Sequence, residues 1–271
     1  MKKKLYFGSN LKMYKTTQET VLYLRRLTEL TRDISREQME LFILPSFTAL
    51  EKSAETVDQE RILLGAQNMC WKEKGPFTGE ISPLMLREAG IHLVMVGHSE
   101  RRQLFGETDF EEGQKAACAL RHGFTVLLCV GETMEEKEYG ISSEVIRKQL
   151  KTGLHEAREK DADNIWIAYE PVWAIGEKGR AASGEYAEKI HQTIKECLRE
   201  LFGEKGRKIP VLYGGSVCQT NAEQFILQPD VDGLYVGRAA WDADEFNALI
   251  RKAVRRYKNS CQQKNQMVDR E

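Results

Sequence analysis

One carboxylate in this sequence is placed as a general base should be, at the end of a short apolar run. Residues 165–169 read Ile-Trp-Ile-Ala-Tyr, a pattern typical of a buried strand, and Glu170 follows at once. Pro171 has a fixed φ and no backbone N–H, so the strand cannot continue beyond Glu170. The Gly-bearing residues 174–179 come next, before a long helical pattern. We therefore expect a rigidly held base beside a segment that can close as a lid.

Two Gly-bearing turns have the composition of a phosphate-binding site. Gly214-Gly215-Ser216 and Gly237-Arg238 each follow an apolar run and each lead into a helix-like pattern. Free backbone N–H groups at the start of a helix form an anion site. Lys12, which follows the first apolar run, adds a positive charge for the same anion. The two turns together predict that the ligand carries a phosphate group.

His98 supplies a group that could act on a carbonyl oxygen. It follows the apolar run 91–96 and can donate a proton. A base, a proton donor and a phosphate site together favour proton abstraction next to the carbonyl of a small sugar phosphate, which gives an enediolate and hence aldose–ketose isomerisation. The same residue types also fit an epimerase or an aldolase-like barrel, although an aldolase would normally need a lysine at this rim for a Schiff base.

These side chains need a fold that brings the ends of many strands to one rim. Apolar runs alternate eight times with amphipathic patterns, and most runs are continuous, as in strands buried on both faces. This predicts an α/β protein with a (β/α)8 barrel, and the active site of such a barrel lies where its strands end. A doubly wound open sheet is the alternative, but its Gly-rich dinucleotide fingerprint is absent after the first run. The predicted strands are 5–7, 41–44, 62–64, 91–96, 124–130, 165–169, 210–213 and 231–236, and the predicted helices include 17–32, 110–121, 141–159, 184–202 and 241–258.

The chain shows no composition break, so we expect one domain over residues 1–258. The polar tail 259–271 is expected to fray and to have no function.

Forty Lys and Arg against 41 Asp and Glu give a formal net charge of -1, which argues against nucleic-acid or polybasic membrane binding. The apolar runs are too short to span a membrane, and the N-terminus has no secretory core. Six cysteines without a Cys-x-x-Cys pair are expected to be reduced thiols of a cytoplasmic protein, with no metal and no cofactor.

Seven short motifs, taken in chain order, resemble those of the triosephosphate isomerase family over essentially the full length. They are Asn-Leu-Lys-Met (10–13), Gly-Ala-Gln-Asn (65–68), Phe-Thr-Gly-Glu (77–80), Gly-His-Ser-Glu-Arg-Arg (97–102), Cys-Val-Gly-Glu (129–132), Ala-Tyr-Glu-Pro-Val-Trp-Ala-Ile-Gly (168–176) and Tyr-Gly-Gly-Ser-Val (213–217). The resemblance implies a TIM barrel that interconverts D-glyceraldehyde 3-phosphate and dihydroxyacetone phosphate, a reaction of glycolysis and gluconeogenesis.

The resemblance also implies a catalytic role for five residues. Glu170 resembles the base that moves a proton between adjacent carbons, and His98 the neutral imidazole that polarises the carbonyl; this family is itself the standard example of that pair. Lys12 and Asn10 resemble the groups that neutralise and orient the substrate, with Glu100 behind them.

Two further sets of residues follow from the same resemblance. Gly176, Ser216, Gly237 and the backbone N–H of Arg238 resemble the phosphate donors. The loop with Phe77 and Thr78 resembles one that inserts into a second subunit, which implies a homodimer.

Three departures from the family pattern leave the substrate open. The lid reads Glu177-Lys178-Gly179 after Gly176, with one apparent extra residue; Arg238 stands where a second glycine is usual; and Leu11 replaces a tryptophan. The first two favour an alternative, an isomerase of a longer ketose phosphate such as L-erythrulose 1-phosphate with the same mechanism. A non-catalytic sugar-phosphate-binding protein is a further alternative, although the joint presence of the four residues at the reaction centre argues against it. These residues are Asn10, Lys12, His98 and Glu170.

Overall fold

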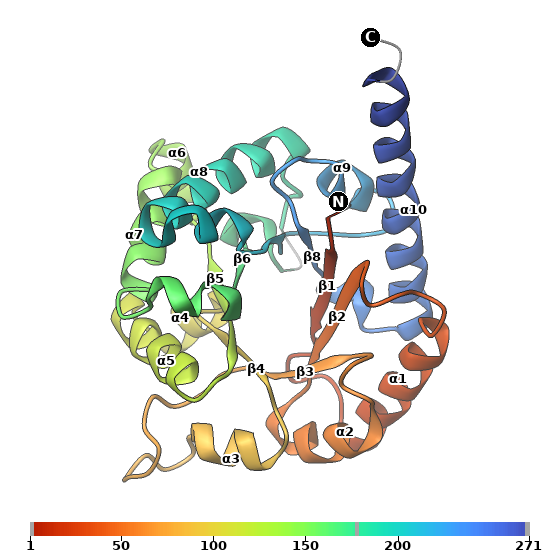
Figure 1. Ribbon diagram of the computed structural model, residues 1–271. Helices are drawn as coiled ribbons and strands as arrows, with labels where there is room; N and C mark the ends of the chain where they lie inside the picture. Colours follow the sequence, from red (N-terminus) through yellow and green to blue (C-terminus); the bar gives the residue numbers. More distant parts are fainter. Residues whose placement is uncertain (1–2, 177–178, 269–271) are drawn as a thin grey trace.

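The strands of the computed structural model, which describes residues 3–176 and 179–268, close into a ring (Figure 1). Eight parallel strands are hydrogen-bonded in chain order, and the last pairs with the first. Tyr6 lies opposite Glu40 on one side and Gly233 on the other. The predicted (β/α)8 TIM barrel is therefore confirmed. The strands are β1 (Leu5–Asn10), β2 (Met39–Leu44), β3 (Leu63–Ala66), β4 (Leu93–Val96), β5 (Thr125–Val130), β6 (Ile165–Tyr169), β7 (Val211–Tyr213) and β8 (Gly233–Tyr235).

Helices cover the outside of this ring (Figure 1). Several begin at a side chain that accepts a hydrogen bond from a free backbone N–H. Thr16 and Thr108 form capping boxes with a glutamate three residues further on, and Ser183 caps the helix that starts at Gly184. The α-helices of the described residues are α1 (Thr17–Leu30), α2 (Leu50–Thr56), α3 (Pro83–Glu88), α4 (Ser99–Phe105), α5 (Asp109–Arg121), α6 (Met134–Glu138), α7 (Ser142–Gly153), α8 (Gly184–Phe202), α9 (Ala222–Ile226) and α10 (Ala243–Val268). Short 3₁₀ segments are η1 (Phe47–Ala49), η2 (Glu159–Asn164), η3 (Val172–Ala174), η4 (Gly203–Lys208) and η5 (Arg238–Ala240).

The strands are mostly apolar because they separate two cores. One core lies between the strands and the helices, and the other fills the inside of the barrel. Bulky side chains close the interior, so the barrel is packed and has no channel. The interior core consists of Phe42, Leu44, Leu93, Met95, Leu127, Cys129, Trp166, Ala168, Leu212 and Tyr235.

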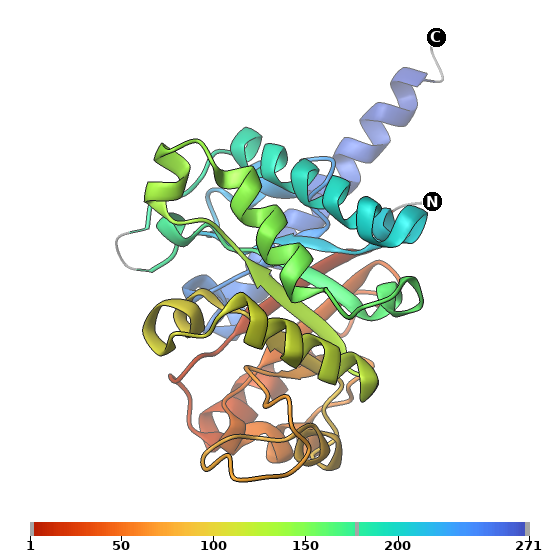
Figure 2. The ribbon, with the colours of Figure 1, turned by 90° about the vertical axis from the view of Figure 1, so that its left-hand side faces the viewer.

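Two helices differ from their predicted lengths. The pattern 141–159 predicts one long helix, but α7 ends at Gly153, a poor helix former, and residues 159–164 form η2. The polar tail from Asn259 was expected to fray, but α10 continues to Val268 and extends past the barrel (Figure 2). The tail contains neither glycine nor proline before Val268, so nothing in it interrupts the helix. Within the described residues, we find no helix with the length and apolar character needed to cross a membrane.

Candidate active site

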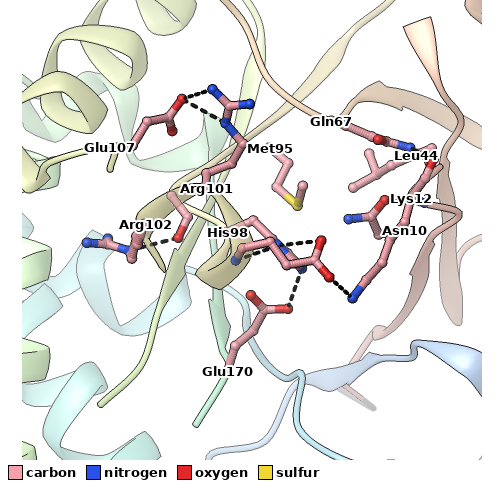
Figure 3. Close-up of polar contacts among 12 residues, drawn as sticks. Asn10, Lys12, Leu44, Gln67, Met95, His98, Arg101, Arg102, Glu107 and Glu170 are labelled. Carbon is pink, nitrogen blue, oxygen red and sulfur yellow. Dashed lines mark hydrogen bonds and ion pairs between the residues drawn. The ribbon is translucent and has the colours of Figure 1, made fainter. Parts of the chain in front are cut away.

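Glu170 and His98 face each other at the carboxyl ends of β6 and β4 (Figure 3). Glu170 Oε1 lies 3.6 Å from His98 Nε2, and the two residues are 4% and 3% exposed. The Glu170 backbone N–H donates to the Val130 carbonyl at 2.7 Å, which continues the strand pairing up to the carboxylate. The barrel thus holds a carboxylate and an imidazole side by side at the edge of one pocket, where both can contact the same ligand.

The hydrogen bonds of His98 define its tautomer. His98 is the N-cap of α4, and its Nδ1 accepts a hydrogen bond of 3.2 Å from the backbone N–H of Glu100. Because Nδ1 accepts, the ring proton of the neutral imidazole is on Nε2, the nitrogen that faces Glu170. His98 is therefore arranged to donate from Nε2 to a ligand oxygen.

Lys12 is fixed at both its backbone and its side chain. Its Nζ lies 2.6 Å from Glu100 Oε1, and its backbone N–H donates to Asn10 Oδ1 at 2.7 Å. Its carbonyl accepts from Gln67 Nε2 at 2.9 Å, while Trp241 Nε1 donates to the Asn10 carbonyl at 3.0 Å. Lys12 adopts a φ of +51°, which is uncommon for a residue other than glycine. The surrounding loops therefore hold a cation at the strand ends in a strained conformation.

A pocket of about 460 Å³ joins this reaction centre to the two predicted phosphate turns. Gly176 and Gly237 border open space, because a Cβ added to either would have no neighbour within 4 Å. Glu177 and Lys178, in the predicted lid, lie outside the described residues. The sequence-predicted residues that line this pocket are Asn10, Lys12, His98, Glu170, Gly176, Ser216, Gly237 and Arg238. A larger hollow of about 570 Å³ lies on the outer surface between α10 and the segment that joins α1 to β2, and it contains none of these residues.

Gly214 allows the base to take its position. A Cβ at this residue would lie 2.8 Å from Glu170 Cγ and 3.3 Å from Tyr235 Cδ1. The glycine that the sequence suggested as part of a phosphate turn therefore also makes room for the carboxylate.

Arg102 supports the turn that carries His98 (Figure 3). Its Nε donates to the Gly97 carbonyl at 2.9 Å, and its guanidinium forms ion pairs with Asp109 and Glu112. Gly97 has a φ of +79°, a conformation that favours glycine. The β4–α4 turn is thus tied to α5, and the imidazole of His98 is held on rigid elements.

Glu132, which follows β5, is buried beneath the start of the lid. It accepts hydrogen bonds from Trp173 Nε1 at 2.8 Å, Tyr186 Oη at 2.8 Å and Tyr169 Oη at 3.0 Å. Burial and this carboxylate raise the pKa of Tyr169 well above its usual range. Glu132, part of the Cys-Val-Gly-Glu motif, therefore anchors Trp173 of η3.

Some pocket residues were not predicted. Tyr235, Cys218 and Trp241 line the pocket. Tyr235 lies within the apolar run 231–236, so its pattern indicated only burial. Phe77 and Thr78 do not line the pocket; they belong to the segment between β3 and α3, which projects from the barrel (Figure 1).

Among the described residues, no three His, Cys, Asp or Glu side chains form a group that could hold a metal ion.

Comparison with known proteins agrees with this geometry. The model of the family "Triosephosphate isomerase" matches residues 5–253. The L-erythrulose-1-phosphate isomerase of Rhizobium etli is 44% identical over 91% of this chain and 91% of its own, and that of Mesorhizobium japonicum is 43% identical over 92% and 96%. The triosephosphate isomerase of Carboxydothermus hydrogenoformans is 41% identical over 93% of this chain and 100% of its own. The chain therefore belongs to the triosephosphate isomerase family and is an isomerase of the aldose–ketose type.

Proposed function

We propose that this enzyme isomerises a small ketose phosphate, with L-erythrulose 1-phosphate as its preferred substrate. The observation that carries the proposal is the pairing of Glu170 Oε1 with His98 Nε2 at 3.6 Å in a pocket that also contains the two glycine turns. In this proposal the turns bind the phosphate, and the pair acts on the carbons beyond it.

The reaction moves one proton between two adjacent carbons and one proton between their oxygens. The Glu170 carboxylate takes a proton from the carbon next to the carbonyl, the electrons of that C–H bond form a C=C bond, and the carbonyl π electrons move to oxygen. The Lys12 ammonium stabilises the negative charge on that oxygen, and His98 Nε2–H donates its proton to it. His98 then takes the proton of the hydroxyl on the neighbouring carbon, which becomes the new carbonyl, while Glu170 returns its proton to the former carbonyl carbon. The product is the isomeric sugar phosphate.

Two observations favour a four-carbon substrate over a triose. The relatives at 44% and 43% identity are named L-erythrulose-1-phosphate isomerases. Arg238 lines the phosphate end of the pocket, where the family pattern has a glycine. A guanidinium adds bulk and hydrogen-bond donors beside the phosphate, so it alters how the ligand is seated without changing the reaction centre.

Triose phosphate is the second candidate, and a specific observation supports it. The relative at 41% identity is named triosephosphate isomerase, and Asn10, Lys12, His98 and Glu170 all line the pocket here. In that case the enzyme interconverts D-glyceraldehyde 3-phosphate and dihydroxyacetone phosphate in glycolysis and gluconeogenesis, in the cytoplasm.

We further propose that the enzyme is a homodimer joined through the loop with Phe77 and Thr78. This loop projects from the barrel, and Gln67 at its base donates to the Lys12 carbonyl at 2.9 Å. Met13, which follows Lys12, is 94% exposed, an unusual state for a large apolar side chain unless a partner covers it.

Initial rates with D-glyceraldehyde 3-phosphate and L-erythrulose 1-phosphate, measured on the natural chain and on Glu170→Gln, test the proposed function. We expect faster turnover of the tetrulose, and a loss on the order of 10²–10⁴-fold with the amide, which cannot take the proton. Turnover of the triose alone would select the second candidate. A chain that binds sugar phosphate equally well with Glu or Gln at 170, and turns over neither substrate, would be a binding protein.

A further inference from the structure

The side chain of Tyr235 crosses the inside of the barrel beneath the candidate site. Tyr235 is the last residue of β8, and its Oη donates to Met95 Sδ at 2.9 Å. Met95 belongs to β4, and in a ring of eight strands β4 lies opposite β8. The side chains of Tyr235 and Met95 therefore meet across the barrel, and Tyr235, at 4% exposure, lies at the floor of the pocket.

The ring of Tyr235 lies beside the proposed base. A single added Cβ at Gly214 would contact both Glu170 Cγ, at 2.8 Å, and Tyr235 Cδ1, at 3.3 Å. On its other side the ring stacks on Phe42, with 5.8 Å between the ring centroids. Because it is packed between the base and a core phenylalanine, the ring has a fixed position.

The hydroxyl of Tyr235 is a polar group at the boundary between the apolar interior core and the polar residues of the site. Burial raises its pKa well above the usual range, nearby Cys129, Glu170 and Glu100 raise it further, and the Asn10 side chain acts in the opposite direction. The hydroxyl therefore keeps its proton under all working conditions. The sulfur of Met95 is a weak acceptor, so a ligand oxygen would be a better partner for this donor.

The groups of the pocket are arranged by depth. Gly176, Ser216 and Gly237 lie on loops beyond the strand ends, and the Glu170–His98 pair lies at the strand ends themselves. Tyr235 is level with Gly8 in the strand register, two residues below Asn10. A ligand whose phosphate is bound at the loops therefore points its other end at the Tyr235 hydroxyl.

We propose that Tyr235 determines specificity: its hydroxyl donates a hydrogen bond to the hydroxyl oxygen on the sugar carbon farthest from the phosphate. This inference rests on the proposed four-carbon substrate, since a triose phosphate has no carbon beyond the two that react. A floor with a hydrogen-bond donor favours a ligand that ends in a hydroxyl, because an unmatched buried donor is unfavourable.

The test is the ratio of kcat/KM for L-erythrulose 1-phosphate to that for D-glyceraldehyde 3-phosphate in Tyr235→Phe. This change keeps the ring between Glu170 and Phe42 and removes only the hydroxyl. We expect kcat/KM for the tetrulose to fall about tenfold, mainly through KM, and that for the triose by a clearly smaller factor. Tyr6→Phe is the matched control, because Tyr6 packs against Trp166, at 5.1 Å between ring centroids, near the other end of the same interior. It should leave the ratio unchanged.

Met95→Leu provides a second variant of nearly conserved volume that keeps the hydroxyl and removes its present acceptor. We expect it to fold and to keep the ratio of the natural chain. If the ratio falls equally in Met95→Leu and Tyr235→Phe, packing sets the preference and the inference is overturned. If neither variant changes the ratio, the hydroxyl does not contact substrate and the inference is overturned as well. Turnover of the triose alone by the natural chain would overturn it and leave the second candidate function intact, whereas turnover of neither substrate would overturn the proposed function as well.

Discussion

Lys12 and Glu170 are both held in states that do not favour stability. Lys12 has a φ of +51°, the only positive value for a non-glycine residue among the described residues. Glu170 Oε2 is buried without a hydrogen-bond partner in the part of the chain that the structure describes. Strained backbone and unpaired polar atoms are costly, and they persist where the surrounding structure enforces them. Both features fit residues whose side chains must be free to interact with a ligand.

Replacement of Lys12 separates the strain of its backbone from the role of its ammonium group. We expect Lys12→Gly to be more stable than Lys12→Ala by about 1 kcal/mol, because glycine adopts positive φ without strain and alanine does not. Both variants lose the ammonium and should lose most isomerase activity. Urea unfolding of the two variants, with activity measured in parallel, checks this. Equal stability of the two would show that the backbone of residue 12 relaxes once the Lys12–Glu100 ion pair is removed.

The ends of the strands, rather than their middles, position the site, and glycines control how closely those ends approach. Gly131 directly follows β5, and a Cβ there would overlap the carbonyl oxygen of Glu170. Gly65 lies within β3, where a Cβ would meet only side-chain atoms of Leu44 and Leu93. The two glycines are thus equally confined but differ in what confines them.

This difference predicts distinct outcomes for two alanine substitutions. Gly131→Ala must move the backbone at Glu170, so we expect kcat to fall more than about tenfold, since misplacement of a catalytic group by about 1 Å is costly. Gly65→Ala overpacks the interior and should reduce the free energy of unfolding by about 1–3 kcal/mol with a much smaller effect on kcat. Steady-state kinetics and thermal unfolding of both variants measure the contrast. Similar kcat values in the two would contradict a specific role for Gly131.

The elements that the sequence predicted best have local boundary signals. The strand 165–169 was predicted with its observed ends because Pro171 stops it. The predicted helix 184–202 matches α8, which the structure shows to be capped by Ser183. The end of α10 was wrong, since polar composition does not by itself unwind a helix. Most of the pocket residues that were predicted are polar or glycine and follow the ends of strands, where the barrel rule applies. Tyr235 was missed because an apolar run indicates burial but not what the hydroxyl of one member faces.

At the scale of the whole molecule, a buried histidine in the helical layer links stability to pH. His191 on α8 is fully buried; its Nδ1–H donates to the Asp230 carbonyl at 3.1 Å and its ring packs edge-on against Tyr169. Burial lowers the pKa of His191 to about 4 from its usual value of 6.5. Between these two values the unfolded chain binds the proton that the folded chain does not. The free energy of unfolding therefore falls as pH decreases through this window, and the full loss is reached below pH 4.

Substitution of His191 by phenylalanine should reduce this pH dependence. The natural chain should lose about 2 kcal/mol more than His191→Phe between pH 7 and pH 5, because phenylalanine keeps the aromatic contacts and takes up no proton. Urea unfolding of both chains at the two pH values gives the difference between their losses of unfolding free energy. The contributions of all other titrating groups are the same in both chains and cancel in this difference. Identical losses would indicate that the imidazole is already protonated, or solvated, in the folded state.

The closing contact of the ring joins the two ends of the chain. Tyr6 pairs with Gly233, so the strand that leads to Lys12 is completed only by the strand that leads to Arg238. During synthesis on the ribosome, the first strand must therefore wait for nearly all of the sequence to emerge, which favours slow final assembly. A sugar phosphate that contacts both strands would bind the closed ring and no earlier form. By mass action it would then act as a selective stabiliser of freshly completed chains, so that newly made enzyme would survive better in cells that already contain its substrate.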